Sequence, residues 1–155
     1  MPTEDKQTVI VDLDGTLADN THRQHWLDTN QHKGMTADER WRVFFGLCGS
    51  DSPKSKVIEI VKIFKSAGHP IWIFSGRSDE VKLETVRWLS YYTVPYDKLV
   101  MRQKDDHRCD TEVKRAMIAP YSKNQFLCVL DDRDTVVAMW RELGLLCLQV
   151  EKGSF

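Results

Sequence analysis

Two carboxylates two residues apart end the first apolar run of the chain. Residues 9–19 read VIVDLDGTLAD, in which Asp12 and Asp14 would share one face of a strand that ran straight on. Gly15 favours a turn here, because glycine adopts backbone conformations that other residues avoid. A strand that ends at this point places Asp12 at its carboxyl edge and Asp14 in the following loop. The two acids could then do different chemistry, although an Asp-Gly pair alone is equally typical of a plain turn.

Similar polar groups follow two later apolar runs, as SGR at 75–77 and DDRD at 131–134. In an open parallel sheet, ligands bind outside the carboxyl ends of the strands, so these loops can meet. The side chains that they would bring together are Asp12, Asp14, Ser75, Arg77, Asp131 and Asp132. Carboxylates this close repel one another unless a hard cation lies among them, and all-oxygen ligation suits Mg²⁺. We therefore predict a phosphate-holding Mg²⁺ site with these ligands: Asp12, Asp14, Asp131 and Asp132.

This set of groups is suited to phosphoryl transfer. Asp12 can attack phosphorus in line and form an aspartyl-phosphate, and Asp14 can protonate the leaving oxygen and then activate water. Ser75 and nearby backbone N–H groups can bind the non-bridging oxygens, while Lys114 is the lysine best placed to neutralise charge on nucleophile and phosphate. Thr16, in the loop after Asp12, and Gly76, in SGR, are assigned to phosphate binding as well.

Alternating strand and helix patterns must position these groups. The strand-like runs are 8–11, 71–74, 98–101, 126–130 and 146–150. One helical pattern follows Ser52-Pro53, interpreted as a cap and first-turn proline, and others begin at Ser78, at Asp110 and near Thr135. Strands that alternate with helices predict an α/β fold, a doubly wound parallel sheet with a Rossmann-like core and right-handed crossovers.

Residues 20–52 interrupt this alternation. They separate the first strand from its expected crossover helix, and their apolar anchors are Trp26, Leu27, Trp41, Phe44, Phe45 and Leu47. We interpret the segment as a small helical cap that leaves the first strand at the carboxyl edge of the sheet and can act as a lid. The chain is thus expected to form a single domain over 1–155, with a cap insertion at about 20–52.

Composition narrows the class of protein. The chain has 155 residues with 22 basic and 23 acidic ones, so its formal charge of -1 provides no global field that would attract nucleic acid or a membrane. Its longest apolar runs are too short for a bilayer span, and its first residues lack a signal-peptide core. The four cysteines form no C-x-x-C pair, which argues against a disulfide framework or a structural zinc. We expect a cytoplasmic location, no membrane contact and no obligate protein partner.

Several of these motifs resemble those of a known enzyme superfamily. DLDGT, the serine of SGR, Lys114 and DDRD resemble, in order, the four motifs of haloacid dehalogenase (HAD) superfamily phosphatases. A narrower resemblance, to the 3′-phosphatase domain of bacteriophage polynucleotide kinase/phosphatases, is carried by SGRSDEVKLETVRWL, MRQKDDHRCDTEVK and DDRDTVVAMWRELGLLCLQVEKGSF. It covers nearly the whole chain except about residues 24–50.

The resemblance implies a role for each matching position. It makes Asp12 the nucleophile, Asp14 the acid/base and Asp131 a metal ligand, while Asp132 is a second acid that reaches the metal through water. It also marks Arg23, Arg77 and Asp110 as functional positions that contact phosphate or substrate. No G-x-x-x-x-G-K-[ST] motif occurs, so we expect no kinase activity. The cap segment does not match, which leaves the size of the substrate open.

The sequence therefore predicts a Mg²⁺-dependent phosphomonoester hydrolase that removes 3′-phosphates from polynucleotide ends. A phosphatase of small nucleotides, such as deoxynucleoside monophosphates, is the alternative within enzymes. A non-catalytic binding protein is the alternative outside them, and the presence of both Asp12 and Asp14 argues against it. The choice between polynucleotide and mononucleotide, and between DNA and RNA, stays open.

Some of these residues also have plain structural interpretations. Asp110 could be a helix N-cap, Lys114 a solvated helix lysine and Arg23 an ordinary loop arginine. The cap histidines, His22, His25 and His32, match no familiar zinc spacing and are interpreted as structural. The aromatic residues of the cap are expected to form its core rather than a base-stacking surface, although one of them could do both.

Overall fold

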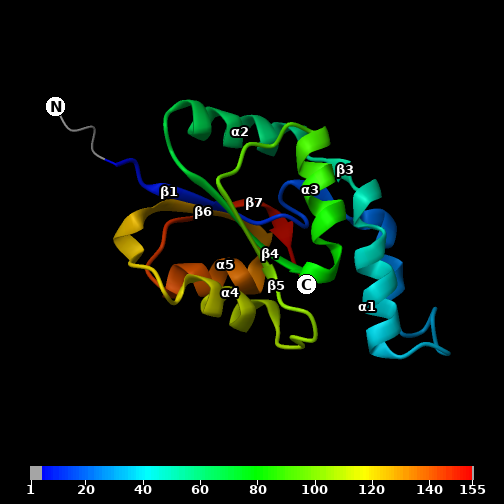
Figure 1. Cartoon of the computed structure of the whole chain (residues 1–155). Coiled ribbons are helices and arrows are strands. Elements are labelled where there is room, and N and C mark those ends of the chain that lie inside the picture. The colour runs from blue at the N-terminus through cyan, green and yellow to red at the C-terminus, as the bar shows by residue number, and fades with distance from the viewer. Residues whose placement is uncertain (1–4, 155) are drawn as a thin grey trace.

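A five-stranded parallel sheet forms the centre of the molecule. The computed structural model describes residues 5–154 and contains strands β1 (Thr8–Val11), β4 (Ile71–Ser78), β5 (Lys98–Arg102), β6 (Phe126–Arg133) and β7 (Cys147–Gly153) in the order β5-β4-β1-β6-β7. β1 lies centrally and pairs in parallel with β4 and β6, as Val9 opposite Ile71 and Val9 opposite Cys128 show. The predicted doubly wound α/β sheet, a HAD-like arrangement, is confirmed (Figure 1).

Several strands run further than their apolar residues predicted, and two of them, β4 and β6, extend into the polar motifs. β4 continues through Ser75, Gly76 and Arg77, and β6 continues through Asp131 and Asp132. The pairing register shifts between Ser75 and Ser78 in β4, and between Asp131 and Arg133 in β6. Two polar stretches that sequence analysis assigned to loops, SGR and the first three residues of DDRD, are therefore the last, irregular residues of strands. There β4 pairs with β5 and β6 pairs with β7.

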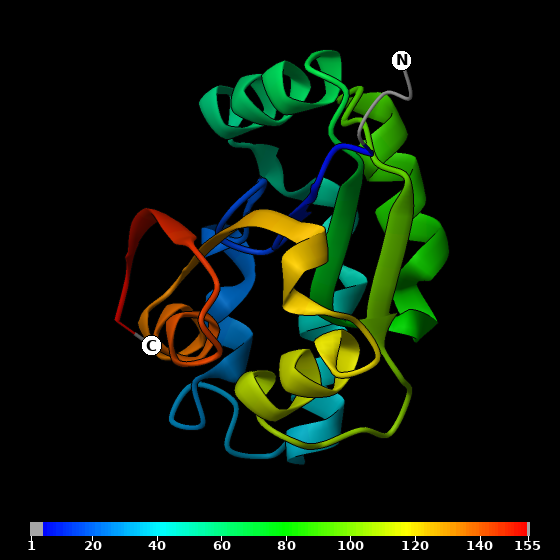
Figure 2. The same ribbon diagram turned by 90° about the vertical axis from the view of Figure 1, so that its left-hand side faces the viewer.

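Helices cover both faces of the sheet. One face packs on α2 (Ser55–Ser66) and α3 (Lys82–Tyr91), whose Ile58, Val61 and Leu89 join the core around Val9 and Val11. The other face packs on α4 (Asp110–Ile118) and α5 (Asp134–Glu142), whose buried side chains pack with Ile10, Phe74 and Val129 of the sheet. Figure 2 shows α3 near the β5 edge and α5 near the β7 edge. The strands carry apolar side chains on both faces of the sheet because helices cover both faces.

Two helix starts differ from their prediction. Ser52-Pro53 does not open α2 but forms the two-residue strand β3 (Ser52–Pro53), and Lys54 is the N-cap residue of α2. Cys109, not Asp110, is the N-cap residue of α4, and the carboxylate of Asp110 is engaged by two arginines instead. The predicted cap at Ser78 is confirmed, since its hydroxyl accepts from Glu80 N–H at the short 3₁₀ turn before α3.

The insertion after β1 is a small helical unit fastened at its base. Strands β2 (Ala18–Asp19) and β3 pair antiparallel, so the segment leaves and re-enters the body at one point. Between them lie a 3₁₀ segment, η1 (Thr21–Leu27), then α1 (Ala37–Gly46) and a short turn, η2 (Cys48–Ser50). Thr36 and Glu39 form a capping box that starts α1. Figure 1 shows α1 beyond the end of the sheet where the strands finish.

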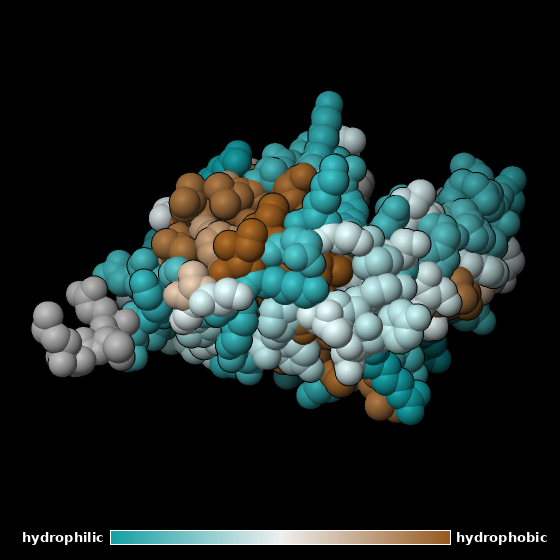
Figure 3. All heavy atoms as spheres, turned by 90° about the horizontal axis from the view of Figure 1, so that it is seen from above, coloured by the Kyte–Doolittle hydropathy of each residue, from teal (hydrophilic) through white to brown (hydrophobic). Residues whose placement is uncertain are grey.

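The outer surface carries one apolar area away from this end. Ile60 and Ile63 of α2 are exposed, and Figure 3, which faces α2, shows apolar side chains gathered on that side. Neither residue lines the cavity described below. No helix within residues 5–154 is long and apolar enough to cross a membrane.

Candidate active site

Three buried carboxylates meet at the carboxyl end of the sheet. Asp12 follows β1 directly, its N–H bonded to the carbonyl of Leu130, while Asp131 and Asp132 are contributed by the neighbouring strand β6. One carboxylate oxygen of each lies within 4.8 Å of the others, and all three residues are buried. In the described part of the chain, this is the group of acidic, His or Cys side chains close enough to hold a metal ion.

Lys114 provides the positive charge inside this cluster. Its buried Nζ donates to Asp12 Oδ1 at 2.7 Å and to Asp131 Oδ2 at 2.9 Å. Trp140 Nε1 also donates to Asp131 Oδ2, at 3.0 Å, which fixes the orientation of that carboxylate. A solvated helix lysine, the plain interpretation of Lys114, is therefore wrong.

The charges of the cluster do not balance. Burial raises the pKa of Asp12 well above its ordinary value, since the attraction of Lys114 is opposed by Asp131 and Asp132. Burial and the charge of Asp131 likewise raise the pKa of Asp132. One ammonium thus leaves three buried carboxylates short of positive charge. Buried carboxylate oxygens with an excess of negative charge suit a hard divalent cation as ligands.

The turn after Asp12 is built to bring Thr16 back onto the cluster. Thr16 Oγ1 lies 3.0 Å from Asp12 Oδ2 and 3.2 Å from Asp132 Oδ1, and the residue is fully buried. Gly15 has a φ of +84°, and a Cβ at this position would lie 2.2 Å from Asp132 Oδ2. Both the backbone conformation and the close approach of Asp132 therefore require glycine. The predicted contact between Thr16 and phosphate stays a prediction.

Asp14 lies apart from the three carboxylates, with two arginines. Its Oδ1 accepts from Arg23 Nη2 at 2.7 Å and from Arg77 Nε and Nη2 at 3.0 and 2.7 Å. Burial raises the pKa of Asp14, but Arg77 and Arg23 outweigh this effect and hold it below the ordinary value. Asp14 does not belong to the group of carboxylates that could share an ion, so its place among the metal ligands stays a prediction.

Asp51, which sequence analysis missed, completes this network. Its carboxylate accepts from Arg23 Nε and Nη2, both at 2.7 Å, and from Arg77 Nη2 at 2.9 Å. Its backbone carbonyl accepts from Trp88 Nε1 at 2.8 Å, which ties it to α3. Asp51 and both arginines are buried, so two acids and two bases balance in charge, and His22 Nε2 of the cap lies 2.8 Å from Asp51 Oδ1.

Phe44 of α1 joins the cap to this group. Its ring lies 4.2 Å from Arg23 Cζ, and its backbone carbonyl accepts from Arg23 Nη1 at 3.1 Å. Arg23 therefore connects the cap to Asp14, and it is not an ordinary loop arginine. Its side chain, like that of Arg77, has no exposed surface.

The end of β4 brings Ser75 and Gly76 to the site. Ser75 is buried, and its Oγ accepts from Arg77 N–H at 3.1 Å. Gly76 lies against Asp110, because a Cβ there would be 2.5 Å from Asp110 Oδ1. Asp110 bridges Arg102 Nη2, at 2.6 Å, and Arg133 Nη1, at 3.0 Å. The contacts that sequence analysis predicted between these residues and phosphate stay predictions.

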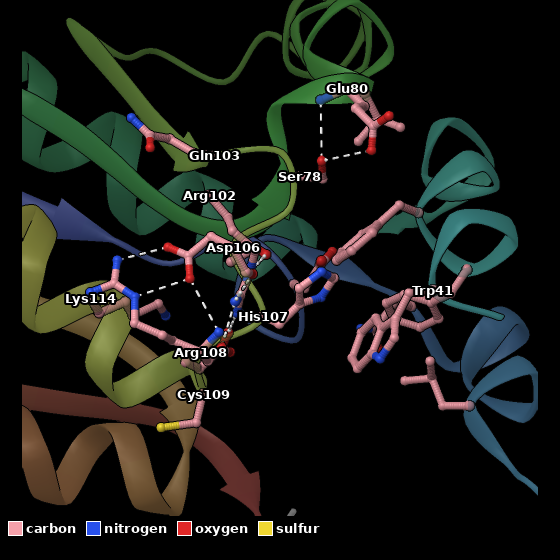
Figure 4. Close-up of a pocket in the computed structure, with 18 of the residues that line it drawn as sticks. Trp41, Ser78, Glu80, Arg102, Gln103, Asp106, His107, Arg108, Cys109 and Lys114 are labelled. Atoms are coloured by element: carbon pink, nitrogen blue, oxygen red, sulfur yellow. Dashed lines mark hydrogen bonds and ion pairs between the residues drawn. The ribbon is translucent and has the colours of Figure 1, made fainter. Parts of the chain in front are cut away.

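A cavity of about 840 Å³ opens above the carboxylates. Its floor contains Asp12, Asp131, Asp132 and Lys114, one wall is formed by the cap, and another by the loop 103–109 between β5 and α4. Figure 4 shows Lys114, Arg102 and Arg108 on one side of this space and Trp41 of the cap on the other. The site can hold a phosphate group at its floor with an organic group above it.

Comparison with known proteins gives one matching family model, and it covers most of the chain. The model of the polynucleotide kinase PNKP phosphatase domain matches residues 33–155. A protein of Autographa californica nuclear polyhedrosis virus, described as a candidate bifunctional polynucleotide kinase/RNA ligase, is 30% identical over 151 residues. That match covers 94% of this chain and 20% of the viral protein.

Solved structures extend the likeness to the fold. A chain of the Pnkp1/Rnl/Hen1 RNA repair complex superimposes with a TM-score of 0.80 at 30% identity, over 100% of this chain and 45% of that one. The class C acid phosphatase from Bacillus anthracis has a TM-score of 0.60 at 19% identity, over 85% of this chain and 53% of that one, and this likeness shows the fold alone. The chain thus spans less than half the length of the viral protein and of the repair-complex chain.

The match over residues 33–155, together with the parallel sheet and the buried acids at its carboxyl edge, identifies the family. The chain belongs to the family of polynucleotide kinase PNKP phosphatase domains and is a HAD-type phosphatase domain.

Proposed function

We propose that the chain removes 3′-phosphates from polynucleotide ends, in a Mg²⁺-dependent reaction that passes through an aspartyl-phosphate on Asp12. The observation that carries this proposal is the position of Asp12. It lies among two further buried carboxylates and Lys114, at the floor of a cavity, in a chain of the PNKP phosphatase family. The names of its relatives, which mention polynucleotide kinase and RNA repair, support a polynucleotide substrate.

Asp12 is proposed as the nucleophile and Lys114 as the group that holds it. One oxygen of Asp12 receives the ammonium of Lys114 and the other lies against Thr16, so the carboxylate is held from both sides. A fixed nucleophile lowers the barrier, because the reacting atoms need not be brought into line again at each turnover. Lys114 also offsets the charge that accumulates when an anionic carboxylate approaches an anionic phosphate.

Asp12, Asp131 and Asp132 are the residues that would hold Mg²⁺. Their buried oxygens are a hard donor set with excess negative charge, which fits this ion. When bound, the ion supplies positive charge between the nucleophile and the phosphate oxygens.

Asp14 is proposed as the acid that protonates the leaving oxygen and then accepts a proton from water. All of its hydrogen bonds within residues 5–154 are accepted by Oδ1, from Arg23 and Arg77. Oδ2 is therefore the oxygen that can exchange a proton with the substrate. The two arginines orient the carboxylate so that this oxygen is presented in a constant position.

A panel of substrates tests the proposal. Release of phosphate is compared for one oligonucleotide phosphorylated at its 3′ end, the same oligonucleotide phosphorylated at its 5′ end, and 3′- and 5′-mononucleotides, with Mg²⁺ present. We expect the highest kcat/KM for the 3′-phosphorylated oligonucleotide and no release with Asp12→Asn. Faster turnover of 5′-mononucleotides than of every 3′-phosphorylated oligonucleotide would replace polynucleotide end repair with the nucleotidase function.

A further inference from the structure

The cap presents aromatic side chains to the cavity that are not buried in the protein core. Trp41 of α1 lines the cavity and is 43% exposed. Phe45 also lines it and stacks on Trp41, with ring centroids 5.4 Å apart and planes inclined by 28°. Leu27 adds an apolar side chain beside them. A large aromatic side chain left partly open to a cavity is available to a ligand.

The packing of the cap depends on a different aromatic residue of the same helix. Phe44 is 5% exposed and covers the buried guanidinium of Arg23. Trp41 packs edge-to-face with Phe44, with centroids 5.4 Å apart at 87°, and yet keeps 43% of its surface exposed. Sequence analysis expected the cap aromatics to form its core. That expectation is confirmed for Phe44, whereas Trp41 is only partly covered.

The opposite wall of the cavity carries nitrogen-rich side chains. His107 and Arg108 of the loop 103–109 line it, and both are more than half exposed. His107 Nδ1 lies 3.8 Å from Asp38 Oδ1, one helical turn before Trp41 on α1. The loop therefore approaches the same face of α1 that presents Trp41. In the view of Figure 4, His107 is the labelled residue of this wall that lies nearest to Trp41, and Arg108 lies beyond it.

We propose that Trp41, backed by Phe45, is the stacking surface for the base of the nucleotide that carries the reacting phosphate. The inference rests on the proposed function and extends it to the group above the phosphate. A ligand that fits this cavity needs an anionic group at the floor and a flat, apolar group at the cap wall, and a nucleotide has both. Every base offers a π-face, so a stacking surface of this kind accepts any terminal base.

The proposal is tested by removing the aromatic ring and the base separately and together. Two oligonucleotides with a 3′-phosphate are compared, one with a base on its last nucleotide and one with a stable abasic sugar analogue at that position. The variants are Trp41→Ala, Trp41→Phe and a control, Trp26→Ala. Trp26 is also a cap residue and stacks on His32 at 4.3 Å, but it does not line the cavity. Thermal unfolding of every variant reports whether its fold is retained.

We expect Trp41→Ala to lower kcat/KM on the base-bearing oligonucleotide by about 10- to 100-fold, the range of one base–aromatic stack. The same variant should leave the abasic oligonucleotide within about twofold, so that the effects of ring and base removal are not additive. Trp41→Phe should recover most of the loss, and Trp26→Ala should match wild type on both substrates.

Equal losses on the two oligonucleotides would overturn the proposal, as would a wild-type enzyme that does not distinguish them. Either result leaves the proposed function standing, provided that the 3′-phosphorylated oligonucleotides are turned over. A wild type that hydrolyses small aryl phosphates but no 3′-phosphorylated oligonucleotide rejects the proposed function itself. If Trp41→Ala unfolds, Trp41→Leu replaces it, because leucine fills space but has no π-face. A loss confined to the base-bearing oligonucleotide then supports the proposal, and an equal loss on both oligonucleotides overturns it.

Discussion

Replacement of Asp51 should destabilise the protein strongly, although this residue touches none of the three carboxylates that could hold a metal. Asp51 is 1% exposed and accepts N–H groups from Arg23 and Arg77 at 2.7 to 2.9 Å. Asp51→Asn keeps the shape of the side chain but removes its charge, so that two buried guanidiniums then share the single carboxylate of Asp14. Removal of one partner from a buried ion pair costs about 3–5 kcal/mol, because the charge that is left cannot return to water.

Urea unfolding of Asp51→Asn measures this cost directly. We expect the free energy of unfolding to fall by about 3–5 kcal/mol and the melting temperature by roughly 6–20 °C. Turnover of a small aryl phosphate should fall by about 10- to 100-fold in the folded fraction, since Asp51 no longer fixes the positions from which Arg23 and Arg77 orient Asp14. Both effects have a single cause, the loss of charge balance in the network.

Glu142→Gln is the matched control. Glu142 accepts from Arg115 Nη2 at 2.7 Å, but the two side chains are 69% and 44% exposed. Solvent screens such a pair, so we expect a change in unfolding free energy of less than about 1 kcal/mol and unchanged turnover. If Asp51→Asn unfolds within about 0.5 kcal/mol of wild type, as an ordinary surface substitution does, the charge-balance account of this network is refuted.

Three further results are expected. Gly76→Ala should keep its fold but lose about 10- to 100-fold in turnover, because a Cβ 2.5 Å from Asp110 Oδ1 must displace a carboxylate that two arginines hold. Unchanged turnover would show that Asp110 can move freely. Arg23→Ala should lower turnover of an aryl phosphate and of a 3′-phosphorylated oligonucleotide by similar factors, because the Arg23 side chain has no exposed surface with which to contact either substrate. A loss confined to the oligonucleotide would indicate direct substrate contact instead. Chelation with EDTA should abolish phosphate release and Mg²⁺ should restore it, with Asp131→Asn requiring more Mg²⁺ than wild type; full activity in excess EDTA would reject the metal site.

The strands and the first acidic motif could be predicted because their signals are local. An apolar run followed by Asp12 and a glycine describes a buried strand that ends in a sharp turn, and the structure confirms β1 at Thr8–Val11. Lys114 could be predicted from chemistry, since buried carboxylates need a cation and the helix at 110–118 begins at the same edge of the sheet. The β1 signal lies within one short segment, and the assignment of Lys114 also depends on the carboxylates that follow two strands.

The arginine network could not be predicted, because its members are far apart in the chain. Asp51 lies 28 residues after Arg23 and 26 before Arg77, and it stands in Gly-Ser-Asp-Ser, which is typical of a turn. The same stretch misled the prediction of the next helix start, where Ser52-Pro53 forms a strand instead of a cap. The place of Asp14 among the metal ligands is a prediction from the meeting of the three polar motifs, and it stays a prediction. The structure places the carboxylate of Asp14 with Arg23 and Arg77, and β1 has already ended at Val11, so the alternation of a strand does not apply to the two acids.

The most direct test of the account is to detect a phosphoryl group on Asp12. Enzyme mixed with a 3′-phosphorylated oligonucleotide and Mg²⁺ is quenched in acid within the first turnover, digested and examined by mass spectrometry. We predict that the peptide containing Asp12 gains the mass of one phosphoryl group, that the gain is absent from Asp12→Asn, and that a 5′-phosphorylated oligonucleotide produces little of it. Rapid phosphate release by wild type with no phosphorylated peptide, or equal release by Asp12→Asn, would contradict the assignment of Asp12 as the nucleophile.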